Sequence, residues 1–590
     1  MRESLRAVVG SFVFFVIAAC GPNSGGGDGE LVSIDIEPAN ATLTYTGTPM
    51  SLEYKAIGHF KDGSTAELPD ATFSLDAAGT GLGELSAATF TASGQGAGKG
   101  GVNAQVGDVT GATSVLVLVH TTDLGPGVPA DGASKFPDDV APVGAQSPAI
   151  VYPLQEAVMP TSVKSPVVQW EGAGGADHLY RVRVVSGYAV VDTILAQDPA
   201  FTFSLQPQSS RWQTLKNSTD GLVRFTVEHW DAASGAQGSA PVSVRLIPAN
   251  ITGAIYYWNL NAGQMEQITE AGRTIAIQNP PQKSNGSRCV ACHTVSKDGR
   301  YLSGALWEGG SQGAVFDMTN DAVKTADPAP TVTPLAENST YTVLFSTFNP
   351  DATRLMLNRG TGLDVIDPMN GASVATTGLP TSGVAHPSWS PDGNSVALVT
   401  SITGGGGPAG WAVDYDRGDL SVMPVTAPDT FGPPVTLVPA SAVDPAFSAP
   451  SWPTFAPDSK WIAYGAGLNS RGRNDSIPAI YPGALFIVDK DAGVSFRLDT
   501  ACGGARDCYL PNFSPYDDGG YFWLVFYSTR DYGNAAAGTK GAQRRQLWVT
   551  AINKAKLANG DPSSVPYWLP DQDVQSANMS AFWALPPPLQ

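Results

Sequence analysis

The chain has 590 residues, of which 42% are hydrophobic and 15% charged, and it contains 65 glycines and 46 prolines. This length exceeds that of a typical single domain, so several hydrophobic cores are expected. The formal net charge is -19 and the sequence holds no block of basic residues, which argues against nucleic-acid binding because an acidic surface repels phosphate groups. Many glycine and proline turns with few long helical periods predict a mainly β protein.

Residues 1–19 have the pattern of a signal peptide. Arg2 and Arg6 precede an apolar run over residues 7–19, which is too short to span a bilayer but has the length of a signal-peptide core. The run closes with "VIAAC", and this ending resembles the lipobox of bacterial lipoproteins. The resemblance implies that Cys20 is lipidated and becomes the mature N-terminus. Plain signal-peptide cleavage after Ala19 is the alternative.

The lipoprotein resemblance also implies a location. A lipid on Cys20 would make the membrane a partner and place the protein in the cell envelope. Gly21 follows the cysteine where an aspartate would stand in a retained lipoprotein, so the outer membrane is the expected destination. Residues 20–30, rich in glycine, are predicted to be a flexible tether.

Residues 31–119 predict a first β-sandwich, because apolar and polar residues alternate in short runs between glycine and aspartate turns. The opening "VSIDIEPANATLTYTGTPMSLEYKAIGHFKDGSTAEL" resembles the group 2 bacterial immunoglobulin-like repeats. The resemblance implies a spacer or an adhesive stalk.

Residues 120–146 form a linker rich in proline, glycine and aspartate, which predicts a domain boundary. Residues 147–250 again alternate, and the strands around "PVVQWEG", "DHLYRVRVVSG" and "GLVRFTVEHWD" resemble a fibronectin type III sandwich. Trp170 and Trp230 are expected in its core. We interpret His178 and His229 as ordinary strand histidines, because no second ligand accompanies either one at metal-binding spacing.

Residues 251–590 contain an internal repeat in which an apolar residue, a small residue, usually proline, and aspartate precede a strand. Its aspartates are separated by 53, 41, 66 and 59 residues, a spacing that predicts a β-propeller. They are Asp298, Asp351, Asp392, Asp458 and Asp517.

The copy "PSWSPDG", Pro387 to Gly393, resembles the repeat of TolB-like propellers. Pro391 fixes φ and Gly393 accepts a positive φ, so the motif predicts a tight turn between two strands. The segments "GAIYYWNLN" and "SAFWALPP" at the two ends of residues 251–590 are expected to supply one further blade that closes the ring. The expected fold class is thus all-β, with two sandwiches followed by a TolB-like propeller of about six blades; five or seven blades are the alternatives.

The stretch "RCVACHTVSKDGR" combines the propeller repeat with the pattern C-x-x-C-H. In c-type cytochromes two such thiols bond to haem and the following histidine binds the iron. Cys289 and Cys292 therefore predict covalent haem c, with His293 as the proximal ligand. The alternatives are a disulfide between the two cysteines, free thiols, or a zinc site, for which a fourth ligand is missing.

Aligning Asp298 with Asp392 places Cys292 on His386. The TolB-like resemblance implies that both lie near one mouth of the central channel, which makes His386 the first candidate for a distal iron ligand; the alternative is that His386 merely begins a strand. Four methionines are further candidates without positional support, and the short helices that wrap a c-type haem are missing from the sequence pattern. The methionines are Met318, Met356, Met369 and Met423.

Cys502 and Cys508 are expected to form a disulfide, the usual state of a close cysteine pair in an exported protein. The predicted function is a lipid-anchored haem protein for electron transfer with a protein redox partner. The alternative is a haem-free envelope scaffold whose propeller binds a protein or glycan. The sequence contains no recognisable catalytic motif, and the repeated aspartates are explained by turn chemistry, so enzymatic activity is not expected.

Overall fold

The computed structural model describes residues 29–588 except residues 139, 141–143, 145, 283–285, 287, 307–311, 335–344, 406, 410–411, 443–444, 471–482 and 504–506. Strands dominate these ranges and the helices are short, which confirms the predicted all-β class. No helix within them is long and apolar enough to cross a membrane. The described residues fall into two compact units, one within residues 1–43, 50–93 and 99–116, the other within residues 44–49, 94–98 and 117–590.

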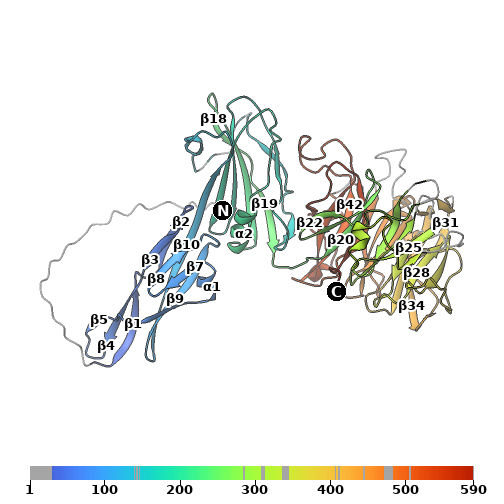
Figure 1. The fold of residues 1–590 in the computed structure, drawn as a ribbon, viewed down its shortest axis with the longest axis horizontal. Helices are drawn as coiled ribbons and strands as arrows, with labels where there is room; N and C mark the ends of the chain where they lie inside the picture. The colour runs from blue at the N-terminus through green and yellow to red at the C-terminus, as the bar shows by residue number, and fades with distance from the viewer. Residues whose placement is uncertain are drawn as a thin grey trace. The chain divides into compact units, whose positions relative to one another are not determined.

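The first unit consists of short strands in three sheets, in which β4 lies between β1 and β5, β8 lies between β3 and β7, and β9 lies between β6 and β10 (Figure 1). Alternate residues such as Ile34 and Ile36 are buried, as expected for strands with one face on a core. The elements are β1 (Leu31–Glu37), β2 (Ala41–Tyr45), β3 (Met50–Glu53), β4 (Lys55–Phe60), β5 (Thr65–Glu67), β6 (Thr72–Leu75), α1 (Ala77–Thr80), β7 (Gly83–Ser86), β8 (Thr89–Ala92), β9 (Gly98–Val106) and β10 (Val109–Leu124).

The second unit begins with two sheets, one in the order β12-β19-β17-β14-β15 and the other in the order β11-β13-β16. The end of β10, Val119–Leu124, runs parallel to β15. The elements are β11 (Ala149–Tyr152), β12 (Val158–Pro160), β13 (Val168–Glu171), β14 (Leu179–Ser186), β15 (Ala189–Ala196), β16 (Ser204–Leu205), α2 (Ser209–Asn217), β17 (Leu222–Asp231), β18 (Gly235–Gly238) and β19 (Val242–Ile247).

Two tryptophans and two histidines of this region were singled out from the sequence. Trp170 is fully buried, as predicted, and packs against Tyr180. Trp230 is only partly buried, because it lies on the opposite face of β17 from His229 and contacts the Lys135 ammonium. His178 and His229 are interpreted as ordinary strand histidines because no second ligand accompanies either one in the sequence, but in the structure their rings contact each other with centroids 4.7 Å apart.

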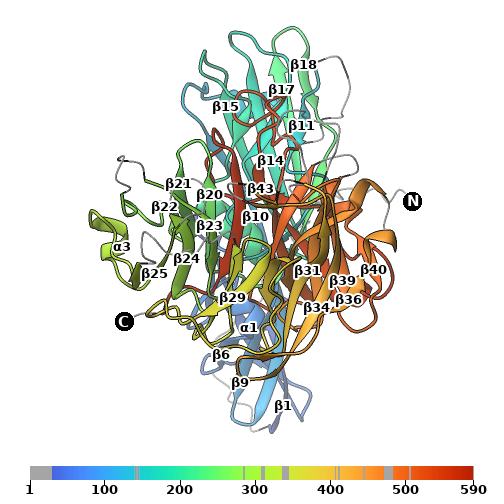
Figure 2. The same cartoon turned by 90° about the vertical axis from the view of Figure 1, so that its right-hand side faces the viewer.

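The remaining residues of the second unit build a propeller, as predicted. In the part of the chain that the structure describes, six sheets succeed one another around a common centre (Figure 2). We number them as blades 1 to 6 in chain order of their first strands. Their innermost strands are β45, β23, β27, β30, β37 and β41, and each of these contacts the next, with β41 returning to β45.

Blades 1 to 3 contain the following elements. Blade 1 has β20 (Ala254–Asn259), β21 (Gln264–Thr269), β22 (Gly272–Ile275) and β45 (Asn578–Ala584). Blade 2 has β23 (Val290–Val295), β24 (Tyr301–Leu306), β25 (Gln312–Asp317) and β26 (Thr333–Pro334), with α3 (Ala322–Thr325) between its last two strands. Blade 3 has β27 (Phe345–Phe348), β28 (Leu355–Arg359) and β29 (Gly362–Ile366).

Blades 4 to 6 complete the ring. Blade 4 has β30 (Ala385–Trp389), β31 (Ser395–Thr403), β34 (Arg417–Ala427), β35 (Thr430–Phe431) and β36 (Val435–Val438), with the hairpin β32 (Gly407–Ala409) and β33 (Ala412–Asp414) inserted. Blade 5 has β37 (Ala449–Phe455), β38 (Trp461–Gly467), β39 (Ala484–Asp489) and β40 (Ser495–Arg497), followed by α4 (Asp499–Cys502). Blade 6 has β41 (Cys508–Phe513), β42 (Tyr521–Ser528), β43 (Gln546–Asn553) and β44 (Tyr567–Trp568).

The C-terminal strand closes the ring. β45 pairs antiparallel with β20, so that Ala254 lies opposite Ala584 and Tyr256 opposite Phe582. Blade 1 is therefore made from both ends of the propeller sequence, as the two segments "GAIYYWNLN" and "SAFWALPP" predicted. The closure leaves no free inner edge at the junction of first and last blades.

Four of the five repeated aspartates accept hydrogen bonds within the turn between the first two strands of a blade, whereas Asp517 forms an ion pair with Lys554. In blade 4, Asp392 accepts hydrogen bonds from the Ser390 hydroxyl at 2.6 Å and from the Asn394 backbone at 3.0 Å. In blade 2, Asp298 accepts from the Ser296 hydroxyl at 2.5 Å and from the Arg300 backbone at 3.0 Å. The same bonds in two blades account for these carboxylates by turn structure rather than by catalysis.

Asn534, in the loop after β42, ties the propeller to the preceding sheets. Its buried amide donates to the carbonyl groups of Trp170, Thr202 and Phe203 at 3.2, 3.0 and 3.0 Å. We expect Asn534→Ala to lower the free energy of unfolding by about 1–3 kcal/mol, because it removes the buried hydrogen bonds to these carbonyl groups. Urea denaturation measures this, with the exposed Asn559→Ala as control; equal stability of the two variants would contradict the proposed role.

Candidate functional site

The innermost strands of all six blades line one cavity of about 100 Å³ at the centre of the propeller. Each strand contributes two or more residues to its wall. They include Cys292 and His293 from β23, Phe345 from β27, His386 and Trp389 from β30, Trp452 from β37, Leu510 from β41, and Ser580 and Phe582 from β45. The channel therefore brings together the sequence-predicted residues Cys292, His293 and His386.

A β-bulge recurs at one position of these strands. Five inner-strand residues have a left-handed φ between 47° and 58°, and at each the pairing with the next strand shifts register. A bulge re-aims a side chain and bends its strand. The five residues are Cys292, His386, Trp452, Leu510 and Ser580. Cys292 and His386 are thus equivalent positions two blades apart, in agreement with the sequence alignment of their repeats.

His293 follows the bulge of blade 2 and lies against blade 1. The side chain is 3% exposed, and its ring packs edge-on against Phe582 with centroids 5.1 Å apart. Neither ring nitrogen makes a hydrogen bond of normal geometry to the described residues, although backbone groups of Tyr256 and Ser580 lie close enough to oppose the effect of burial on the pKa of the ring. Burial lowers the pKa of His293 to about 4, so the imidazole is neutral near pH 7 and has a free lone pair, as a metal ligand requires.

Cys289 and Cys292 are not joined in a disulfide, and both are partly buried. Burial, followed by the neighbouring Cys289, raises the pKa of the Cys292 thiol to about 12. Cys292 lines the channel and packs against the hydrophobic core of blades 2 and 3. Cys289 precedes β23 and is not part of the channel wall.

His386 is held in one orientation by its surroundings. The side chain is 2% exposed and stacks on Trp452, with ring centroids 4.0 Å apart. Tyr415 donates its hydroxyl proton to the Pro450 carbonyl at 2.7 Å and lies 3.1 Å from Nδ1 of His386. Because the tyrosine proton is used, Nδ1 must be the donor to Tyr415, which leaves the lone pair on Nε2.

Nε2 of His386 has no hydrogen-bond partner among the described residues, and burial lowers the pKa of the ring to about 3. A histidine whose Nδ1 is fixed by a neighbour and whose Nε2 is unpartnered has the arrangement typical of metal-binding imidazoles. The four candidate methionines have no such placement. Met318, Met356 and Met423 are buried in hydrophobic cores, Met369 is exposed, and none of them lines the channel.

Lys297 is a channel residue that the sequence interpretation missed. Its ammonium donates to the carbonyl groups of Phe513 and Trp583 at 3.1 and 3.4 Å, and burial lowers its pKa to about 8. Lys297 occupies the repeat position at which Pro391 stands in blade 4. A lysine in place of the usual proline at this repeat position could have identified Lys297 from the sequence.

The predicted disulfide lies away from the channel. Cys502 and Cys508 form a disulfide with Cα atoms 5.8 Å apart, between the end of α4 and the start of β41. Cys20, the predicted lipidation site, is outside the described residues.

The residues of the C-x-x-C-H motif fit a c-type haem in their chemistry, because Cys292 and the neutral imidazole of His293 line the channel and Cys289 lies three residues before Cys292, outside the channel wall. The channel cavity is too small to enclose a haem completely. The described cavity of about 100 Å³ is smaller than the roughly 300–1,000 Å³ of sites that bury a ligand of cofactor size. A porphyrin held by these residues would therefore lie largely outside this cavity.

No protein-family model matches the chain, and no curated protein is similar to it in sequence. Solved structures that resemble its fold include a nidogen/laminin complex, with 8% identity and a TM-score of 0.32 over 56% of this chain and 97% of the other. The tricorn protease has 11% identity and a TM-score of 0.26 over 90% and 52%. The Cps50 (Swd1) β-propeller domain from Myceliophteria thermophila has 10% identity and a TM-score of 0.25 over 45% and 79%. Similarity at this level carries no information on function.

Proposed function

We propose that the propeller carries one c-type haem bound through Cys289 and Cys292, with His293 as axial ligand, and exchanges electrons with a protein partner in the cell envelope. The observation that carries the proposal is the state of His293 within the C-x-x-C-H motif. Its ring is buried and neutral, and neither nitrogen has a hydrogen-bond partner in the described channel. An unsatisfied buried nitrogen costs free energy, which a bond to iron would recover.

A bound haem would supply one-electron redox chemistry. The chain's own residues would hold and orient it. The edge contact of Phe582 fixes the plane of the His293 ring, and Tyr415 fixes the tautomer of His386. Within this proposal His386 would be a second residue able to hold the iron, since its Nε2 is unpartnered among the described residues and the residue lines the same cavity.

The proposed location follows from the sequence. Lipid on Cys20 would anchor the protein at the outer membrane, with residues 20–30 as a flexible connection to the folded units. The membrane would then be a partner through the lipid alone. Loss of membrane association in Cys20→Ser, with a working signal peptide retained, is the expected consequence.

The test is covalent haem attachment in cells with a working c-type maturation system. The exported protein is expected to gain about 0.6 kDa in intact mass and a c-type α-band in its pyridine haemochrome spectrum. Cys289→Ala/Cys292→Ala should lose both signals. His386→Gln is the matched control, because it alters the channel without touching the attachment cysteines; it should keep the mass gain and change only the spectrum of the native protein.

Absence of both the added mass and the α-band would reject the haem proposal. A haem-free scaffold that binds a protein or glycan would then be the better function. The small channel volume favours this second candidate, as do the aromatic side chains of Phe345, Trp389 and Trp452 on the channel wall. Aromatic rings are common in surfaces that recognise other molecules.

A further inference from the structure

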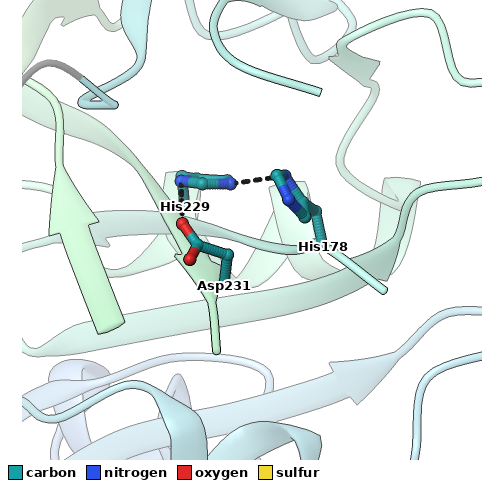
Figure 3. Close-up of side chains that lie close together, drawn as sticks. All are labelled: His178, His229 and Asp231. Carbon is teal, nitrogen blue, oxygen red and sulfur yellow. Dashed lines mark hydrogen bonds and ion pairs between the residues drawn. The ribbon is translucent and has the colours of Figure 1, made fainter. Parts of the chain in front are cut away.

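Strands β14 and β17 bring together three side chains that can bind a metal ion (Figure 3). His229 and Asp231 are two residues apart on β17, so their side chains lie on the same face. Tyr180 of β14 lies opposite His229 and Leu179 opposite Trp230. His178 directly precedes β14, and the same register brings it beside Asp231.

The three groups lie at distances near those of a metal site. Nδ1 of His178 is 2.9 Å from Nε2 of His229, and Nδ1 of His229 is 3.9 Å from Oδ2 of Asp231. One ligand atom from each residue can be chosen so that all three lie within 4.8 Å of one another. Two nitrogens bound to one zinc ion at about 2.0–2.1 Å in tetrahedral geometry are about 3.3 Å apart. The 2.9 Å contact uses Nε2 of His229 and the 3.9 Å contact uses its Nδ1, so binding of one ion through a single nitrogen of His229 requires one of the two neighbouring side chains to turn toward that nitrogen.

Two backbone hydrogen bonds fix the orientation of the Asp231 carboxylate. Its Oδ1 accepts hydrogen bonds from the backbone N–H groups of Ala233 and Ser234, each at 2.8 Å. These backbone bonds lower the pKa of Asp231 and keep it ionised. Oδ2 faces His229 and remains available, so the fixed carboxylate can offer one oxygen to a cation.

His229 has the properties of a buried ligand. It is 0% exposed, and its Nδ1 makes no hydrogen bond to the described residues. The lone pair on this nitrogen is the group that an imidazole offers to a metal ion.

The site is open to ions from one side. His178 lines a cavity of about 540 Å³ whose wall also contains Asp131, Asp177 and Asp198. The same wall contains Lys135, which pairs with Asp131 at 2.7 Å, so Asp177 and Asp198 are the carboxylates that can attract a cation to this cavity. Water and ions in this cavity can therefore reach His178.

We propose that His178, His229 and Asp231 bind one divalent transition-metal ion, with zinc as the best match, and leave at least one coordination position open to solvent or to a ligand from a partner. Two imidazoles and a carboxylate are ligands that zinc takes in proteins, and three protein ligands with an open position are typical of its reactive sites. This site is separate from the propeller channel and from its cysteines.

The test uses the full chain in the Cys289→Ala/Cys292→Ala background, which removes metal binding by those thiols. After removal of metals with a chelator, Zn²⁺ is titrated calorimetrically and Co²⁺ by its visible absorption. We expect one high-affinity ion per chain. His178→Ala and Asp231→Asn should each weaken binding by a factor of about ten or more, the range seen when metal-site residues are lost.

His59→Ala is the matched control, because His59 forms a single histidine–carboxylate pair with Asp35 at 2.8 Å without a second histidine; its affinity should equal that of the parent. Zn²⁺ should also raise the melting temperature of the parent more than that of His178→Ala. His178 is partly exposed, so its variant should keep the circular dichroism spectrum of the parent. Equal Co²⁺ binding by the parent and both site variants, or no binding by the parent, would overturn the proposal and leave the 2.9 Å contact as a hydrogen bond between two histidines.

Discussion

A chain ending at Ala577 is expected to lose the cooperative unfolding transition of the propeller. This truncation removes β45, the inner strand of blade 1, and with it the buried Trp583 and the pairing of Tyr256 with Phe582. Burial of one large apolar side chain contributes about 1.5–3 kcal/mol. The lost side chains and strand pairing together exceed about 5 kcal/mol, which is the lower end of the stability of a typical domain.

Differential scanning calorimetry measures this loss. A chain ending at Leu585 is the matched control, since it keeps β45 and the hydrogen bond from the Leu585 backbone to the Lys297 carbonyl at 2.9 Å. The control should melt as the full chain does. A melting temperature of the shorter chain within about 2 °C of the full chain, a small shift for a domain, would contradict closure by β45.

Arg181→Met is expected to lower the free energy of unfolding by about 3–5 kcal/mol near neutral pH, the usual result of removing one partner of a buried ion pair. Arg181 and Glu228 are both buried, and Nε of Arg181 lies 2.6 Å from a Glu228 oxygen. Arg181 also donates to the carbonyl groups of Phe136 and Pro137 at 3.1 and 2.7 Å. Methionine fills the space but replaces none of these bonds.

The effect of Arg181→Met should depend on pH. Burial raises the pKa of Glu228 to about 7, against the opposing charge of Arg181, so removing the arginine raises this pKa further. The folded state then binds a proton more tightly than the unfolded state, and stability falls as the pH rises toward the folded-state pKa. Chemical denaturation should therefore give a larger loss at pH 8 than at pH 5. Arg224→Met, at an exposed position of the same strand, is the control, and an equal loss at both pH values would argue against an uncompensated Glu228 carboxylate.

Local signals in the sequence predicted the propeller. The turn around Pro391, Asp392 and Gly393 depends on residues that are adjacent in the chain, and its chemistry repeats in other blades. The helix α2 was not predicted, because its buried Trp212 and Leu215 provide only one helical period in nine residues. A segment of this length gives too few turns for periodicity to be recognised.

The sites depend on features that the sequence does not express locally. C-x-x-C-H is a contiguous motif and could be identified directly, whereas the equivalence of Cys292 and His386 required the alignment of two repeats. The contact of His178 with His229 was missed, because residues 51 positions apart meet only through the register of β14 and β17. A one-residue shift in that register would place the two rings on opposite faces.

At the bulges of the inner strands the backbone conformation stays the same while the side chain on the channel wall varies. The backbone alone would favour glycine or asparagine at a left-handed position, yet Cys292, His386, Trp452, Leu510 and Ser580 share this conformation with side chains of very different size and polarity. The blade does not specify which side chain stands there. Five of the six blades thus offer one interchangeable position on the channel wall, and a family of such propellers could change what its channel recognises by single substitutions, without any change in strand pairing or turns.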